Sequence, residues 1–307
     1  MTQPLRSIEA PRHAPSGSLR WSLAPVREAR CLLEEGRHAE VVERLRPRPY
    51  EELRTAPELA VLFATALMQV GHLEQADQVS AQALSTARAV GDHRQEALAT
   101  ALSGEVALAL GDLPRASRWF SQARTLAAEQ RDTPLAGECS ARLGQIALAC
   151  DDPGSAVTAL LGAVAAYEAL GAAPEVLRCQ LDLANAYRRT GRLDDALAIA
   201  DRAVAAARVL GAAALHADAL ATRAEVQLVA GDPGVALREA VQAAAMQRSV
   251  GELAKEAEAL SLARQAQTAL GAPRRRVLAS TETRREGRHA GAACGSRIEL
   301  AEKCHVR

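Results

Sequence analysis

Residues typical of turns recur every 20 positions along most of this chain. Nine of these eleven positions are glycine, which ends a helix in the left-handed backbone conformation without a steric clash. The stretches between them are rich in good helix formers at helical spacing, and none shows the alternation of a β-strand. The sequence therefore predicts an all-α chain. The turn positions are Gly71, Gly91, Gly111, Arg131, Asp151, Gly171, Gly191, Gly211, Gly231, Gly251 and Gly271.

Alternate turns differ in sequence, so the full period is 40 residues. Small residues recur at three places in each period, and such positions mark where two helix backbones approach closely. Five residues after the turn stand Ala76, Ala116, Ala156, Ala196 and Ala236. Twelve residues after it stand Ala83, Ala123, Ala163, Ala203 and Ala243. Seven residues before it stand Ala64, Gly104, Gly144, Ala184 and Ala224.

The composition suits thin layers between helices better than one thick core. Apolar residues make up 49% of the chain, but Phe, Trp and Tyr together only 2%. The 37 basic and 37 acidic residues balance. This balance excludes a strongly basic nucleic-acid-binding protein and a strongly acidic disordered chain.

The phase of these turns and small residues resembles the tetratricopeptide repeat (TPR) family, in the forty-residue variant of MalT-like bacterial regulator sensor modules. The resemblance implies a right-handed α-solenoid of antiparallel helix pairs, whose first helices line a concave face. We expect a disordered tail at 1–21 and a solenoid over 22–271, followed by a basic, disordered tail at 272–307. Within the solenoid, a short unit (22–56) precedes five full units (57–256) and a capping helix (257–270).

One polar row falls on the first helix of every unit, six residues before the turn. It consists of Thr65, Glu105, Gln145, Asn185 and Glu225. On a concave face such a row could hydrogen-bond an extended peptide. It could equally be the solvated side of an amphipathic helix.

Arginines gather on the first helices of the middle units. Arg142, Arg178, Arg188 and Arg189 stand there, with Asn185 one turn from the last two. Arginine binds carboxylates with two parallel hydrogen bonds, so an acidic or C-terminal peptide is a candidate ligand. The alternative is that these arginines pair with local carboxylates such as Asp182 or Asp218.

Two further candidates for the groove are apolar. Leu108 and Leu148 each stand three residues before a turn in successive units. They either supply a hydrophobic step beside the arginines or belong to the core.

No motif for phosphate binding, dinucleotide binding, zinc proteolysis or serine hydrolysis occurs. We expect no cofactor, no metal and no enzymatic activity. His289, Cys294, Cys304 and His305 match no common zinc-finger spacing.

The six cysteines are scattered singly, which favours a reducing compartment. We expect no secretory leader and no membrane span, and hence a cytoplasmic protein.

The leading hypothesis is a non-catalytic scaffold that binds a partner protein or peptide in its concave groove. The alternatives are a ligand-sensing module of a bacterial transcriptional regulatory system and an enzyme with an unrecognised site. The C-terminal stretch carries nine basic and four acidic residues, a net charge of 9 − 4 = +5. This tail could bind nucleic acid weakly, or it could be a solvated end.

Overall fold

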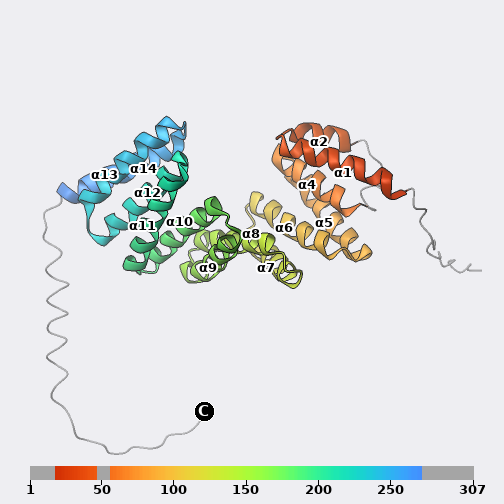
Figure 1. Ribbon diagram of the computed structural model, residues 1–307, viewed down its shortest axis with the longest axis horizontal. Coiled ribbons are helices and arrows are strands. Elements are labelled where there is room, and N and C mark those ends of the chain that lie inside the picture. Colours follow the sequence, from red (N-terminus) through yellow and green to blue (C-terminus); the bar gives the residue numbers. More distant parts are fainter. Residues whose placement is uncertain (1–17, 47–55, 272–307) are drawn as a thin grey trace, which may run out of the picture.

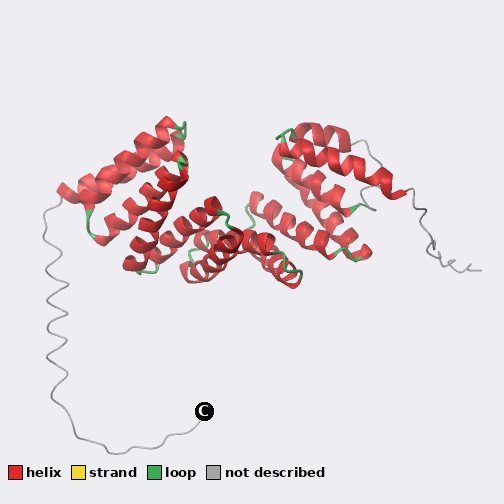
Figure 2. Cartoon of the chain, in the orientation of Figure 1, coloured by secondary structure: helices red, strands yellow, loops and turns green. Residues whose placement is uncertain are grey.

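The computed structural model describes residues 18–46 and 56–271, and over these ranges the chain forms helices and no strand (Figures 1 and 2). The helices are α1 (Ser18–Glu34), α2 (His38–Leu45), α4 (Pro57–Val70), α5 (Leu73–Val90), α6 (His93–Ala109), α7 (Leu113–Glu129), α8 (Thr133–Ala149), α9 (Pro153–Leu170), α10 (Ala173–Arg189), α11 (Leu193–Leu210), α12 (Ala213–Ala230), α13 (Pro233–Ser249) and α14 (Leu253–Gly271). The predicted all-α solenoid of consecutive helix pairs is confirmed.

The helix pairs follow one another along an arc (Figure 1). From α4 onward, each helix packs mainly on its neighbours in sequence, so stability is spread over unit interfaces rather than one central core. First helices also contact each other across units: α4 meets α6, and α10 meets α8 and α12. The second helices α7 and α9 lie at the outside of the bend in Figure 1. The first helices therefore form the inner, concave side.

The turns share one backbone conformation. Gly71, for example, has φ +89°, and the two non-glycine turn residues, Arg131 and Asp151, have φ +57° and +58°. In several turns the next residue is an aspartate whose side chain accepts a hydrogen bond from the first turn of the following helix; the Asp112 carboxylate accepts from the Arg115 amide at 3.0 Å. A left-handed residue followed by a capping aspartate thus ends one helix and starts the next.

The predicted small positions are the closest contacts in each unit. The alanines five and twelve residues after the turns are all fully buried, as are Ala64, Ala184 and Ala224. Gly104 and Gly144 occupy the same place in the two middle units and are also buried. The register read from the sequence is therefore confirmed.

Glycine replaces alanine where the facing helix carries a large side chain. A Cβ on Gly104 would lie 3.0 Å from the Phe120 ring, and a Cβ on Gly144 would lie 2.5 Å from Leu160 Cγ. Phe120 and Leu160 stand 40 residues apart, and the next units carry Ala200 at that position. The combined volume of the two facing side chains at this contact thus stays small in each unit, although the units share that volume differently between the two helices.

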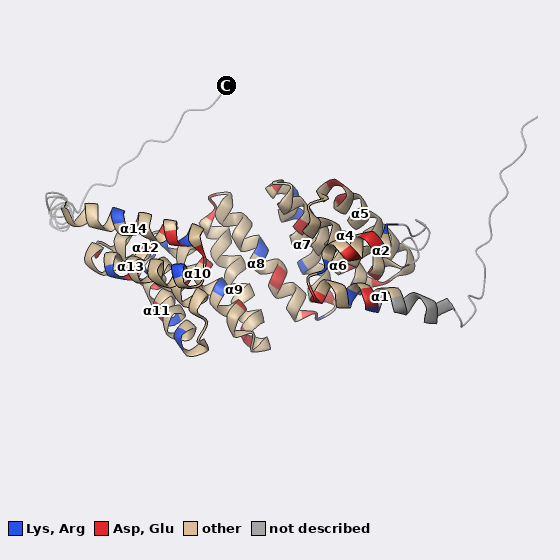
Figure 3. Ribbon diagram, turned by 90° about the horizontal axis from the view of Figure 1, so that it is seen from above, with Lys and Arg blue, Asp and Glu red and all other residues tan. Residues whose placement is uncertain are grey.

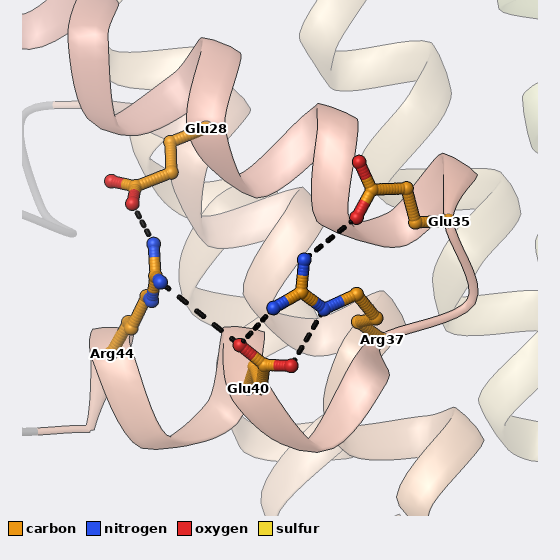
Figure 4. Close-up of polar contacts among 5 residues, drawn as sticks. All are labelled: Glu28, Glu35, Arg37, Glu40 and Arg44. Atoms are coloured by element: carbon orange, nitrogen blue, oxygen red, sulfur yellow. Dashed lines mark hydrogen bonds and ion pairs between the residues drawn. The ribbon is translucent and has the colours of Figure 1, made fainter.

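The first helix pair is held partly by charge. Helix α2 is only eight residues long, and its buried residues are Val41, Val42 and Leu45. Around it, Arg37 pairs with Glu35 at 2.8 Å and with Glu40 at 2.6 Å, while Arg44 pairs with Glu28 on α1 (Figure 4). Because these groups are exposed, each pair adds little alone, but together they tie α2 to α1.

The described ends of the solenoid differ slightly from the expected boundaries. Helix α1 begins at Ser18 rather than at residue 22, and the last helix begins at Leu253 rather than at 257. Gly271 is the last residue of α14. Residues 1–17 of the expected tail at 1–21 lie outside the described residues, as does the whole expected tail at 272–307 with His289, Cys294, Cys304 and His305.

Helix α9 is apolar and long enough to cross a membrane by composition, with a mean hydropathy of 1.2. Its packing is that of a second helix, between α8 and α10. The residues that it buries, Ala156, Ala159, Leu160 and Ala163, face these neighbours.

The contact between Gly144 and Leu160 gives a prediction whose sign depends on the background. In the native chain, Gly144→Ala gains about 1 kcal/mol of helix propensity but overpacks the contact, which costs about 1–3 kcal/mol, so the Tm should fall. In a Leu160→Ala background the same change should raise the Tm, because the obstructing side chain is gone.

Gly162→Ala on α9 is the control, since its added Cβ would meet only Ser140 Oγ at 3.9 Å. This change should raise the Tm in both backgrounds. If Gly144→Ala also stabilised the native chain, the close approach described here would be wrong.

Candidate binding groove on the first helices

The predicted polar row lies along the first helices, but its members make internal contacts. Thr65 on α4 donates to the Val61 carbonyl of its own helix at 2.9 Å. Glu105, Gln145, Asn185 and Glu225 each contact an arginine on the first helices. The row therefore forms part of a connected polar surface.

Most of this surface is a ladder of contacts between residues 37 positions apart. Arg142 Nε donates to Glu105 Oε1 at 2.7 Å, and Gln145 Nε2 donates to Asp182 Oδ2 at 3.1 Å. Farther along, the Arg188 guanidinium lies 3.4 Å from Glu225. Lys255 Nζ donates to Asp218 Oδ2 at 2.8 Å. The spacing is one helical turn short of the 40-residue repeat, so each contact joins a first helix to the first helix of the next unit.

Contacts within helices connect the rungs. Arg142 reaches Gln145 at 3.3 Å on α8, and Arg188 reaches Asn185 at 2.7 Å on α10. Polar contacts thus join the first helices from α6 to α14, and charges of both signs are interspersed along the solenoid (Figure 3). Any ligand on this face would bind to a surface that already joins neighbouring units.

The four predicted arginines differ in how far they are engaged. Arg142 and Arg188 bridge units, as described above. Arg189 donates to the Leu148 carbonyl at 2.8 Å and lies 3.7 Å from Asp151. Arg178 has only a 3.9 Å contact with Glu175, and its side chain is 63% exposed. Among the four, Arg178 is the one most open to a ligand.

The two predicted leucines face the core to different degrees. Leu148 is buried, in a cluster with Leu160 and Tyr187. Leu108 is half-buried against the cluster around Phe120. Leu148 is therefore a packing residue, and Leu108 keeps some exposed surface.

Three carboxyl groups of the inner face have raised pKa values. Partial burial is the main cause for Glu138, Asp182 and Glu225. The charge of Glu105 adds to the effect on Glu138, and that of Glu258 adds to the effect on Glu225. The inner face therefore holds carboxylates whose negative charge is only partly offset by neighbouring positive groups. Most of the arginines beside them already make polar contacts within the chain.

Two larger hollows lie beside second helices, away from the polar ladder. One, of about 550 Å³, lies between α7 and α9 over the end of α8, and is lined by Ser117, Ser121 and Cys150, among others. The other, of about 530 Å³, lies between the first half of α10 and the end of α11, beside the turn at Gly171, and is mostly apolar. It includes Val209, which is 85% exposed. These hollows are the competing surface for a partner.

Sequence reasoning missed the acidic and lysine members of the ladder. Asp182 and Asp218 were considered only as local partners for arginine, but in the structure they accept from Gln145 and Lys255. The sequence signal that could have revealed them is the set of complementary polar residues 37 positions apart, three fewer than the 40-residue repeat. No group of three or more metal-binding side chains lies together within the described ranges.

The raised pKa of Asp182 predicts a pH-dependent effect of Asp182→Asn. The folded state binds this proton more tightly than the unfolded state, whose pKa is about 3.9, so the native carboxylate lowers stability as pH rises through its folded pKa. The asparagine variant should therefore have the higher Tm at pH 7, and its advantage should disappear toward pH 4. Glu129→Gln, at the exposed end of α7, is the control for the removal of one surface carboxylate. A variant less stable than the native chain at pH 7 would contradict this description.

Comparison with protein-family models gives no match, and no curated protein sequence matches either. Solved structures do match. The sensor-bearing STAND protein from Pyrococcus horikoshii, which contains a tetratricopeptide repeat sensor, aligns with a TM-score of 0.64 at 14% identity. The alignment covers 78% of this chain and 36% of that one.

Two further structures align over most of their own length. TPR-like repeats of the kinesin light chain type from Podosopora anserina align with a TM-score of 0.57 at 17% identity, covering 65% of this chain and 98% of that one. A Rap protein complexed with competence and sporulation factor aligns with a TM-score of 0.55 at 14% identity. The alignment covers 81% of this chain and 77% of that one. At these identities the comparison concerns the fold, and by helix order, turn geometry and these alignments the chain has the tetratricopeptide-repeat solenoid fold.

Proposed function

We propose that this chain is a non-catalytic scaffold or adaptor that binds a protein or peptide segment along its concave face. The observation that supports the proposal best is the polar ladder, which runs over the first helices of successive units and offers hydrogen-bonding groups at a regular spacing. An extended segment can use such groups one unit at a time. The Rap protein of the same fold was solved with its competence and sporulation factor.

The finer proposal is that the segment carries an acidic side chain or a C-terminal carboxylate. Arg178 supports it, because this guanidinium is well exposed and only weakly paired. Arg189 would contribute by exchanging its contact with Asp151 for the ligand. Arg142 and Arg188 instead hold neighbouring units together, so their proposed contribution is to keep the face in place.

A second candidate is a ligand-sensing module of a transcriptional regulatory system. The archaeal STAND protein with a repeat sensor supports it. Because the ladder crosses unit boundaries, a ligand that exchanges its contacts would change the angle between units. DNA binding would then come from another subunit or from residues 272–307, and a DNA mobility-shift assay with and without these residues separates this candidate from a scaffold.

We also propose a cytoplasmic location and a function without cofactor. The four cysteines of the described ranges are unpaired, two of them exposed, which suits a reducing compartment.

Charge reversal on the two faces tests the proposal with matched variants of the full chain. The inner variant carries Arg178→Glu and Arg189→Glu, and the outer variant carries Arg202→Glu and Arg238→Glu on the exposed sides of α11 and α13. Each variant changes the net charge by the same amount. Both are used as bait in affinity capture from lysate, after their helicity and Tm have been compared with those of the native chain.

We expect the outer variant to keep the partner of the native chain and the inner variant to lose it, by tenfold or more in captured amount. Loss in the outer variant with retention in the inner one would contradict groove binding. Retention in both would remove the acidic-segment proposal.

A further inference from the structure

A hollow of about 330 Å³ lies where the first helices α10, α12 and α14 meet. Its charged groups are Arg188, Glu225 and Glu258, one from each helix, and Leu228, Val229 and Leu262 supply apolar wall. Its size is at the lower end of the range for ligand pockets. Unlike the two larger hollows, it lies on the concave face.

The charges of this hollow do not balance. Glu225 lies 3.4 Å from the Arg188 guanidinium, which also donates to Asn185 at 2.7 Å. Glu258 makes no ion pair with any residue in the described ranges. Among the residues that line the hollow, two carboxylates therefore face one guanidinium, while Arg189 and Lys255 lie outside the lining and act on Glu225 and Glu258 from there.

The environment of Glu225 agrees with this imbalance. Burial and the nearby charge of Glu258 raise the pKa of Glu225 against the opposing charges of Arg188 and Arg189. A further positive charge between the two carboxylates would stabilise their ionised forms. The neighbouring leucines and valine offer contact for an aliphatic stem. A long side chain with an apolar stem and a cationic end is lysine or arginine.

From this geometry, we infer that the hollow between α10, α12 and α14 is a subsite for a basic side chain of the bound segment, with Glu225 and Glu258 as its carboxylate ligands and Leu228, Val229 and Leu262 along its stem. This inference rests on the proposed function, since the segment is the one proposed to bind the concave face. It adds a basic residue to the ligand, at the C-terminal end of the groove, beyond the exposed Arg178 of α10.

Methyl NMR of the full chain tests the subsite without knowledge of the partner, because leucine and valine methyl groups line it. The probe is Nα-acetyl-lysine-N-methylamide. The matched controls are the norleucine derivative, which keeps the stem but lacks the charge, and the glutamate derivative. We expect saturable shifts at Leu228, Val229 and Leu262 with lysine, and binding at least tenfold weaker with both controls.

Three variants assign the contacts. Glu225→Gln and Glu258→Gln should each weaken lysine binding about tenfold, whereas Glu129→Gln on α7 should leave it unchanged. Equal binding of norleucine, preferential binding of glutamate, or no loss in either carboxylate variant would overturn the inference. A response to lysine that appears only after residues 272–307 are removed would also overturn it, because the occupant would then be this chain's own basic tail.

The NMR result is independent of the capture experiment. If the hollow binds lysine but only the outer variant loses the captured partner, the subsite stands and the proposed groove binding is removed. If the inner variant loses the partner but the hollow gives no response to lysine, the proposed function stands and the subsite is removed.

Discussion

The close approach of two helices at small side chains is the contact on which every unit depends. Gly144 leaves room for Leu160 and Gly104 leaves room for Phe120, whereas units with a small partner such as Ala200 use alanine. Because bulky residues are few, the layers stay thin, and stability accumulates unit by unit rather than from one core. This regular stacking brings equivalent residues of successive first helices to one face, which creates the polar ladder.

The fold was largely predictable because a solenoid repeats its local rules. The 20-residue turn spacing and the three small positions predicted the helices and their register, and both are confirmed. The outer bounds differ slightly from the expectation: α1 begins at Ser18 and α14 at Leu253, rather than at 22 and 257.

The candidate site was less predictable, because it depends on contacts between units. The sequence placed Arg142 and Arg188 on the first helices, but not their pairing with Glu105 and Glu225. These pairs depend on how far one unit is displaced against the next, and a single sequence shows that displacement only as the 37-residue spacing. The face that was expected to be an arginine-rich groove is instead a mixed surface with undercompensated carboxylates, so a bound segment would meet both an exposed arginine and an acidic hollow.

Hydrogen exchange of the full chain, free and saturated with a captured partner, tests the concave face as the binding surface most directly. We expect slower exchange in the first helices α8, α10 and α12, with α7, α9 and α11 unchanged, because the segment would lie on the ladder. Slower exchange in α11 and the start of α10, around the apolar hollow at Val209, with α8 and α12 unchanged, would contradict binding on the concave face.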